Sequence, residues 1–409
     1  MGAPAARAAE LSRIWAREGH DVSVLTGFPN HPTGVVPPAY RKAMRRLVGR
    51  EYLDGVDVVR TWLLPLPNRR AGERALNYSS FLLSAAVAGS FLERPDVVIA
   101  TSPQLLVGLA GWWIARLKSV PFVFEVRDLW PESLAAVGMG NPNSLMHRTL
   151  AAIANFLYRN ADHIVVVTSA FKNYLVEHRQ VAPEKISVVE NGVNARLFCP
   201  HPPSQEIRRQ IAAEDKFVVS YIGTMGVAHG LETVLDAAHI LQERAPHISF
   251  MLVGEGAEKQ ALVSRAMSMG LRNLTFFDQQ ARERVPAFIC SSDACLVMLK
   301  KAELFKTVLP TKLLEFMSCG RPVLLAVDGE ARRIMDDAGA GLFVGPQNAP
   351  DLAEKIVQLA NNPGLCEVMA RNGRSYIVRQ FSRQQTASRY IAVLENLLSR
   401  HHVHAAVAV

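Results

Sequence analysis

The chain has few cysteines, and their placement excludes one class of protein. Only 5 of its 409 residues are cysteine, and none stands in a Cys-x-x-Cys spacing. An odd, scattered set argues against a disulfide-stapled scaffold and does not indicate a zinc site. This usage is typical of a reducing cytoplasm, so we expect a cytoplasmic protein without a structural metal.

Long hydrophobic runs are also missing. The longest, Leu105–Leu117, is shorter than the about 20 residues that span a bilayer. The first residues lack the continuous apolar core of a signal peptide, and Ala6 stands where a myristoylation motif requires Ser or Thr. The sequence therefore predicts no integral membrane anchor.

Acidic residues are in deficit, because 45 Lys and Arg face 37 Asp and Glu, a net charge of +8. This balance favours anionic partners. A solvated face and a contact with an anionic membrane surface both remain open for the densest basic cluster. It consists of Arg41, Lys42, Arg45, Arg46 and Arg50.

What is present indicates a two-domain α/β protein. Hydrophobic residues make up 49% of the chain, which is ample for packed cores, and 409 residues exceed one ordinary domain. Strand-like apolar runs alternate with segments of helical period, as in parallel sheets covered by helices on both faces. The expected strands are 21–26, 96–100, 121–126, 163–168 and 186–190 in the first half, and 217–222, 248–253, 273–277, 293–299 and 322–327 in the second.

A proline-rich segment marks the expected boundary between the halves. Three prolines fall within Cys199–Ser204, where they oppose both helix and ladder hydrogen bonding. We therefore expect an N-terminal domain over residues 1–199 and a C-terminal domain over residues 205–382. A last helix over residues 383–400 is free to return to the first domain.

The start of the first domain departs from the doubly wound pattern. Such a domain begins with a buried strand, and a Gly-rich turn then leads into the first helix. Here a helix over residues 5–17 follows Gly2-Ala-Pro4 with no strand before it. Either the start was placed too late or the first sheet is incomplete.

Three loops that follow expected strands carry most of the chemistry-bearing residues, and such loops are where open parallel sheets bind ligands. The first, Arg127–Ser133, combines charge, an aromatic and a proline, and a salt-bridged turn explains it as well as a site does. The second, Tyr221–Gly230, contains three glycines, which permit close approach to a pyrophosphate but also form simple turns. A further loop, which contains Gly254 and Gly256, follows the expected strand 248–253 in the same half of the chain as Tyr221–Gly230 and permits the same close approach.

The third loop, Thr307–Gly320, leads into a short helix. Pro310 suits its first turn and Gly320 its end, which places Lys312 and Glu315 on one face. A lysine there can reach phosphate oxygens and a carboxylate one turn later can accept ribose hydroxyls, although an exposed ion pair is the alternative. Together the loops of this half favour a bound nucleotide diphosphate.

The order of motifs along the chain resembles the retaining glycosyltransferases of family 4, which have the GT-B fold of two Rossmann-like domains facing a cleft. The likeness covers nearly the whole chain and is closest to the bacterial branch that builds O-antigen, capsule and colanic acid, particularly transferases of N-acetyl-L-fucosamine type. The motifs are Gly2–Arg7, Gly19-His20, Thr26–Pro32, Phe124–Ser133, Asn191–Val193, Gly254–Glu258 and Pro310–Glu315.

The resemblance implies the substrates. The donor would be a UDP-sugar, with an N-acetylated deoxyhexosamine as the sugar, and the acceptor a polyprenyl-diphosphate-linked sugar at the inner face of the cytoplasmic membrane. Docking there fits the basic N-terminal half and the apolar segments Phe81–Leu92 and Leu105–Leu117, which core helices explain equally well. No cofactor, metal or nucleic acid is expected.

The resemblance also implies roles for individual residues. Lys312 would take the diphosphate, with Arg127 and Asp128 as the further catalytic residues, facing the acceptor or the transferred sugar. Glu315 would hold the ribose, while the acceptor side would also include Asn30 and Glu132. The remaining expected donor-binding residues are Gly2, Gly223, Thr224, Gly254, Gly256, Lys306 and Thr311.

The sequence departs from the wider family at four positions. The family's paired glutamate would stand at Thr307, and its phosphate-binding arginine and lysine fall near Thr224 and His229. Arg127 stands where many relatives have histidine. We interpret this as a shifted charge arrangement in which Lys312, helped by Lys306, carries the diphosphate.

Two other functions remain open from the sequence. A UDP-sugar 2-epimerase shares the fold and would need paired carboxylates, for which Asp128 and Glu132 are available. A truncated, inactive nucleotide-binding protein is the second alternative, because of the missing first strand.

Overall fold

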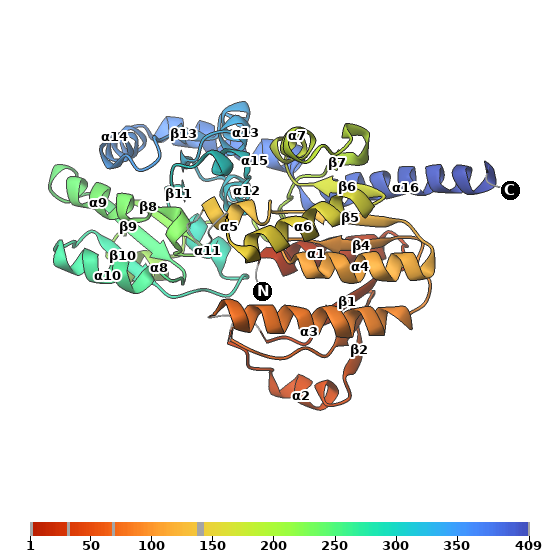
Figure 1. Cartoon of the computed structure of the whole chain (residues 1–409). Coiled ribbons are helices and arrows are strands. Elements are labelled where there is room, and N and C mark those ends of the chain that lie inside the picture. The colour runs from red at the N-terminus through yellow and green to blue at the C-terminus, as the bar shows by residue number, and fades with distance from the viewer. Residues whose placement is uncertain (1–2, 31–32, 68–69, 137–142, 408–409) are drawn as a thin grey trace. The chain divides into compact units, whose positions relative to one another are not determined.

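The computed structural model describes residues 3–30, 33–67, 70–136 and 143–407, and Figure 1 shows its course. The chain divides into two compact units. The N-terminal unit comprises residues 8–190 and 387 onward, and the C-terminal unit comprises residues 191–386 with the start of the chain up to Arg7. The predicted α/β class with Rossmann-like parallel sheets is confirmed in both units.

The C-terminal unit is built on one six-stranded sheet in which all neighbouring strands are parallel. The order β10-β9-β8-β11-β12-β13 corresponds to the doubly wound order 3-2-1-4-5-6. The strand order therefore reverses between β8 and β11, which is where such sheets bind ligands. The strands are β8 (Phe217–Ile222), β9 (Ile248–Val253), β10 (Leu274–Phe277), β11 (Ala294–Met298), β12 (Val323–Ala326) and β13 (Gly341–Phe343).

Helices cover both faces of this sheet, so its central strands are buried as continuous apolar runs. On one face Leu313 and Phe316 belong to the core, and on the other Val234 and Leu241 do. The helices are α8 (Gln205–Gln210), α9 (Glu232–Arg244), α10 (Lys259–Ser268), α11 (Val285–Cys290), α12 (Thr311–Ser318), α13 (Glu330–Ala338), α14 (Ala349–Ala360) and α15 (Pro363–Gln380), with short 3-10 turns η2 (Val227–His229) and η3 (Glu303–Thr307).

The N-terminal unit contains two sheets. One has the parallel order β4-β5-β6-β7, and the other has the order β1-β3-β2, in which β1 and β3 are parallel and β2 and β3 form an antiparallel hairpin. The strands are β1 (Ser23–Gly27), β2 (Val48–Leu53), β3 (Val56–Thr61), β4 (Val98–Thr101), β5 (Phe122–Val126), β6 (His163–Val166) and β7 (Ile186–Val188).

Helices α3 and α4 pack side by side in this unit. They contain the two apolar segments noted in the sequence, and Phe81 and Ala85 of α3 meet Ala110 of α4 in a small core. The remaining helices are α1 (Ala3–Arg17), α2 (Pro38–Met44), α5 (Glu132–Ala136), α6 (Leu145–Asn160), α7 (Ser169–Arg179), the turn η1 (Pro183–Lys185) and α16 (Arg383–Val407), while α3 spans Ala71–Ser90 and α4 spans Leu105–Lys118.

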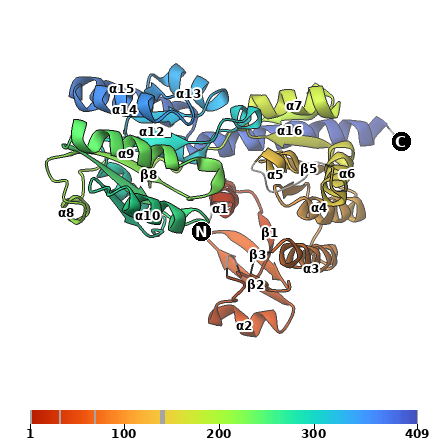
Figure 2. The same cartoon turned by 60° about the vertical axis from the view of Figure 1, so that its left-hand side comes forward.

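The last helix, α16, is shared between the units at Thr386. From Ala387 onward it belongs to the N-terminal unit, where Tyr390 and Leu394 pack with Leu11 and Trp15 of α1. The Trp15 indole donates a hydrogen bond of 3.1 Å to the Ala387 carbonyl. Figure 2 shows α16 behind the strands of this unit, close to α7.

Most predicted strands are found within one to three residues of their expected ends, and β8 and β9 match in full. The hairpin of β2 and β3 and the short strand β13 were missed. No strand precedes α1 among the residues that the structure describes. The expected linker over residues 199–204 stays a prediction; in the structure Ser204 donates its backbone N–H to Ser291 Oγ at 2.9 Å.

None of the helices in the described parts of the chain is both long and apolar enough to cross a bilayer.

Candidate functional site

The loops that follow β8 and β9 lie against each other at the point where the strand order of the C-terminal unit reverses. The Gly223 N–H donates to the Val253 carbonyl at 2.9 Å, and the Met225 N–H donates to the Glu255 carbonyl at 2.8 Å. The loop after β11 joins them, because the Lys300 N–H donates to the Ala228 carbonyl at 2.8 Å. Three strand ends thus meet at one site.

Two glycines make this contact possible. A Cβ at Gly254 would lie 1.9 Å from the Gly223 carbonyl oxygen, and one at Gly256 would lie 2.2 Å from the Met225 carbonyl oxygen. Both residues have positive φ, +149° and +159°. A side chain at either position would push the two loops apart, so glycine is required by space and by conformation.

Lys312 extends from the first turn of α12 over the loop after β8. Its Nζ lies 2.8 Å from the Tyr221 hydroxyl oxygen, and the Tyr221 hydroxyl donates to the Thr224 carbonyl at 2.6 Å. The amine also lies 4.0 Å from the centre of the Tyr221 ring. A Cβ on Gly223 would come within 2.6 Å of Nζ, so the missing side chain leaves room for the lysine.

Burial controls the electrostatics around this lysine. Loss of solvent lowers the pKa of Lys312 to about 7, although the Glu315 carboxylate acts in the opposite direction. Burial and the charge of Lys312 lower the pKa of His229 to about 4. The neutral His229 ring has Nδ1 3.2 Å from the Gly226 carbonyl, which assigns the proton to Nδ1. Lys312 is then the side chain of this loop that can take up a positive charge near neutral pH.

Glu315 has a partner that the sequence did not reveal. Its carboxylate lies 3.1 Å from Nη1 of Arg282, both side chains are largely buried, and the Arg282 guanidinium lies 5.0 Å from the Phe198 ring centre. The alternative of an exposed pair between Lys312 and Glu315 is therefore not what the structure contains. Lys312 contacts Tyr221, and Glu315 contacts Arg282.

The other predicted donor residues differ in their placement. Thr224 offers its carbonyl to Tyr221, and Thr311 begins α12 next to Lys312. Lys306 forms an exposed ion pair of 2.8 Å with Glu303, so its help to Lys312 stays a prediction. Gly2 lies outside the described residues.

The predicted acceptor residues belong to the N-terminal unit, at the end of β5. The Arg127 N–H donates to Ser102 Oγ at 2.8 Å. Asp128 accepts from the Trp130 indole at 3.1 Å, and burial raises the pKa of this carboxyl group.

Glu132 and Asn30 are placed differently from Asp128. Glu132 forms a largely buried ion pair with Arg179 of α7, so it fixes α5 to α7. Asn30 accepts the Gly34 N–H at its backbone carbonyl, 2.6 Å away. The acceptor role of Glu132 and Asn30 stays a prediction.

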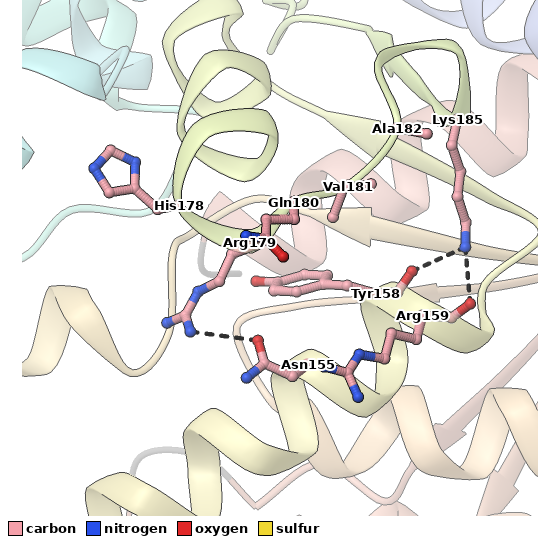
Figure 3. Close-up of a pocket in the computed structure, with 9 residues that line it drawn as sticks. All are labelled: Asn155, Tyr158, Arg159, His178, Arg179, Gln180, Val181, Ala182 and Lys185. Carbon is pink, nitrogen blue, oxygen red and sulfur yellow. Dashed lines mark hydrogen bonds between the residues drawn. The ribbon is translucent and has the colours of Figure 1, made fainter.

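A hollow of about 500 Å³ lies on the other side of Arg179 in the same unit, and Figure 3 shows its lining. Two of its basic groups are engaged: Lys185 donates to the Tyr158 and Arg159 carbonyls at 2.9 Å, and Arg179 donates to Asn155 at 3.3 Å. The nine lining residues include none of the predicted site residues, so we do not assign the site to this hollow.

Tyr221 and Arg282 are the two residues of the site that sequence reasoning missed. Tyr221 stood in a quoted motif as part of a strand, and only its distance to a lysine 91 residues later gives it a role. Arg282 lies outside any motif. Among the described residues, no group of three or more His, Cys, Asp or Glu side chains could hold a metal ion.

Comparison with known proteins gives consistent matches along the chain. A family model described as glycosyl transferase 4-like domain matches residues 2–192, and one described as glycosyl transferases group 1 matches residues 203–376. The chain is 26% identical over 398 residues to the putative colanic acid biosynthesis glycosyl transferase WcaI of Escherichia coli K12, covering 93% of each protein.

Solved structures share the fold. Sucrose-phosphate synthase from Thermosynechococcus elongatus matches with a TM-score of 0.77 at 19% identity, covering 98% of this chain and 94% of that one. Anabaena HepE, crystallised in complex with UDP, matches with a TM-score of 0.67 at 15% identity, covering 92% of this chain and 100% of that one. Two Rossmann-like domains are common to these structures and to this chain.

Proposed function

Since the chain belongs to the family 4 glycosyltransferases, we propose that it transfers a sugar from a UDP-sugar to a polyprenyl-diphosphate-linked acceptor, with retention of configuration. The observation that carries the donor half of this proposal is Lys312 held over the glycine loops at the switch point of the C-terminal sheet. HepE, with the same fold, was crystallised with UDP.

The donor site explains how UDP would be held and released. Gly223, Gly254 and Gly256 let the diphosphate approach the backbone, and Lys312, in its protonated form, supplies the positive charge that stabilises the departing diphosphate. Glu315 accepts the ribose hydroxyls with its remaining lone pairs while Arg282 holds it in place. Thr224 and His229 carry no charge. Lys312 would therefore neutralise the diphosphate without the arginine and lysine that bind it in the wider family.

We propose that the reaction is a front-face displacement. The bond between the sugar anomeric carbon and the UDP oxygen breaks, and a bond to the acceptor hydroxyl oxygen forms on the same face. The hydroxyl proton passes to the departing phosphate oxygen, so no protein nucleophile is needed. Arg127 and Asp128 face the acceptor or the transferred sugar in this proposal, and Glu132 and Asn30 are further acceptor residues.

The sugar and the pathway rest on likeness to relatives. WcaI is named for colanic acid biosynthesis, and the motifs resemble the branch that acts in O-antigen and capsule synthesis. An N-acetylated deoxyhexosamine is therefore our proposed donor sugar, and a bacterial surface polysaccharide the proposed product.

The N-terminal unit offers a surface for the membrane that carries such an acceptor. Residues 35–50 contain no Asp or Glu, and their exposed apolar side chains Val35, Leu47 and Val48 stand among basic ones. Each Lys or Arg near an anionic bilayer contributes about 1 kcal/mol of attraction. Besides Arg50, which pairs with Asp57, the exposed basic residues are Arg41, Lys42, Arg45 and Arg46.

Vesicle sedimentation tests this surface. We expect binding to phosphatidylglycerol vesicles and not to phosphatidylcholine vesicles, and loss of at least tenfold in affinity when the four basic residues of α2 and its C-terminal turn become serine. Replacing four exposed arginines of the C-terminal unit, Arg244, Arg272, Arg371 and Arg379, is the matched control. Equal loss in both variants would mean that only net charge matters.

A UDP-release assay tests the transfer itself. The assay contains pooled UDP-sugars, with and without a polyprenyl-diphosphate-linked sugar, and we expect UDP to appear only when the acceptor is present. The Glu315→Gln variant should bind UDP about tenfold more weakly, because an amide is a weaker acceptor for ribose hydroxyls than a carboxylate. Interconversion of the UDP-sugar alone would instead indicate the epimerase, although the ion pair of Glu132 with Arg179 engages one of its two required carboxylates.

A further inference from the structure

Tyr221 connects the two parts of the proposed donor site. Its side chain is fully buried, its hydroxyl donates to the Thr224 carbonyl at 2.6 Å, and its oxygen is 2.8 Å from Lys312 Nζ. One hydroxyl therefore links the lysine of α12 to the glycine loop after β8. Phenylalanine would fill the same space without either hydrogen bond.

We propose that Tyr221 is a positioning residue for the nucleotide diphosphate. Its hydroxyl holds the Lys312 amine over the loop, and on binding the amine exchanges this hydroxyl for a phosphate oxygen and takes up one proton from solvent where it is uncharged. The inference rests on the proposed donor site and adds to it a coupling between nucleotide binding and protonation. The nitrogen gains the proton, and no other bond changes.

The groups that face Lys312 favour this exchange. Tyr221 of β8 and His229 of η2 are neutral neighbours, and His229 lies edge-on to the Tyr221 ring with centres 5.9 Å apart. Glu315, one turn along α12, is the nearby carboxylate, and its charge is shared with Arg282. A bound diphosphate would supply the strong anion that holds the lysine in its charged form.

The lowered pKa of Lys312 sets the direction in which UDP affinity changes with pH. With the pKa of Lys312 at about 7, most of the amine is uncharged above pH 7.5, and a bound diphosphate raises that pKa. Binding then consumes a proton, so UDP affinity falls by up to about tenfold for each pH unit above 7.5. The terminal phosphate of UDP has its second pKa at about 6 and is already fully ionised in this range.

Calorimetry of UDP binding at pH 7.5 and 8.5, in two buffers of different ionisation enthalpy, measures the proton directly. We expect the unmodified chain to take up close to one proton per UDP. Tyr221→Phe leaves the lysine buried but removes the hydroxyl that holds it, so we expect UDP to bind about tenfold more weakly while the uptake of close to one proton persists. Tyr52→Phe, at an exposed tyrosine, should behave as the unmodified chain.

Two results would overturn the inference while leaving the donor site in place: no proton uptake by the unmodified chain, or a UDP affinity of Tyr221→Phe equal to that of the unmodified chain. A Lys312→Met variant, which has no amine to protonate, should show no uptake, and uptake there would assign the proton to another group. If UDP, GDP and ADP all fail to bind the unmodified chain, the proposed donor function fails together with this inference.

Discussion

At the scale of single residues, the site depends on glycines, which have no side chain, as much as on the side chains around them. Gly254 allows the loop after β9 to touch the backbone at Gly223, and Gly223 in turn leaves room for the Lys312 amine. The sequence predicted both glycines from their place after strands. Only the distances in the structure show why glycine is needed at both positions, because the atoms that a side chain would meet lie on other segments of the chain.

Gly254→Ala should therefore reduce stability strongly. Its Cβ would lie 1.9 Å from the Gly223 oxygen at a φ of +149°, so the two loops must separate. We expect a loss of about 3 kcal/mol or more, measured by denaturant unfolding, with weaker UDP binding. Gly364→Ala is the control: no atom lies within 4 Å of its Cβ position and α15 favours alanine, so its stability should rise slightly or stay unchanged.

Local sequence patterns predicted part of the donor site. The residues that were missed take part in it only through contacts between positions far apart in the sequence. Pro310 and the spacing of Lys312 and Glu315 mark a helix start with two side chains on one face, which any helix of this length would produce. Their partners Tyr221 and Arg282 stand 91 and 33 residues away along the chain. No local period relates such positions.

At the scale of secondary structure, the hairpin of β2 and β3 is the instructive error. Leu53 pairs with Val56 across a two-residue turn, Asp54-Gly55, with φ of 52° and 89°. Asp-Gly between alternating segments is a strong hairpin signal, so this element was predictable. The basic cluster beside the turn indicated only a charged surface. In the structure, Arg50 of that cluster pairs with Asp57 across the hairpin at 2.7 Å.

Gly55→Val should loosen this hairpin. A β-branched residue at a φ of 89° costs roughly 1–2 kcal/mol, and a Cβ at this position would already lie 3.3 Å from the Ala16 Cβ. Hydrogen exchange of the β2 and β3 amides should report the loss. Asp54→Asn should leave protection within about 0.5 kcal/mol of the unmodified chain, because Asn tolerates positive φ and the exposed pair of Asp54 with Arg13 contributes little. Equal protection in Gly55→Val would contradict the assigned turn.

At the scale of the whole molecule, neither unit is a continuous piece of chain. The chain changes from one unit to the other within α1 after Arg7, again after Glu190, and within α16 after Thr386. The alternation of strands and helices predicted two parallel-sheet domains correctly. It could not predict this division, because the packing of Tyr390 against Trp15 joins residues 375 positions apart, with ring centres at 5.3 Å.

Two shortened chains test the contribution of α16. Ending the chain after Thr386 removes Tyr390 and Leu394 from the core around Trp15, and at about 1.5–3 kcal/mol for each buried side chain we expect the N-terminal unit to lose about 3–6 kcal/mol. Ending it after Arg400 keeps both residues and should leave stability unchanged. Hydrogen exchange in β5 and β6 measures the effect, and similar protection in both shortened chains would exclude a role for α16 in this core.

The return of α16 also sets an order of events during synthesis. Leu11 and Trp15 leave the ribosome early, but Tyr390 and Leu394 are made after the entire C-terminal unit. At about 5–20 residues per second, the apolar face of α1 waits roughly 20–80 seconds for its partner. A nascent chain of this design spends most of its synthesis with an open binding surface, which is the kind of segment that chaperones recognise.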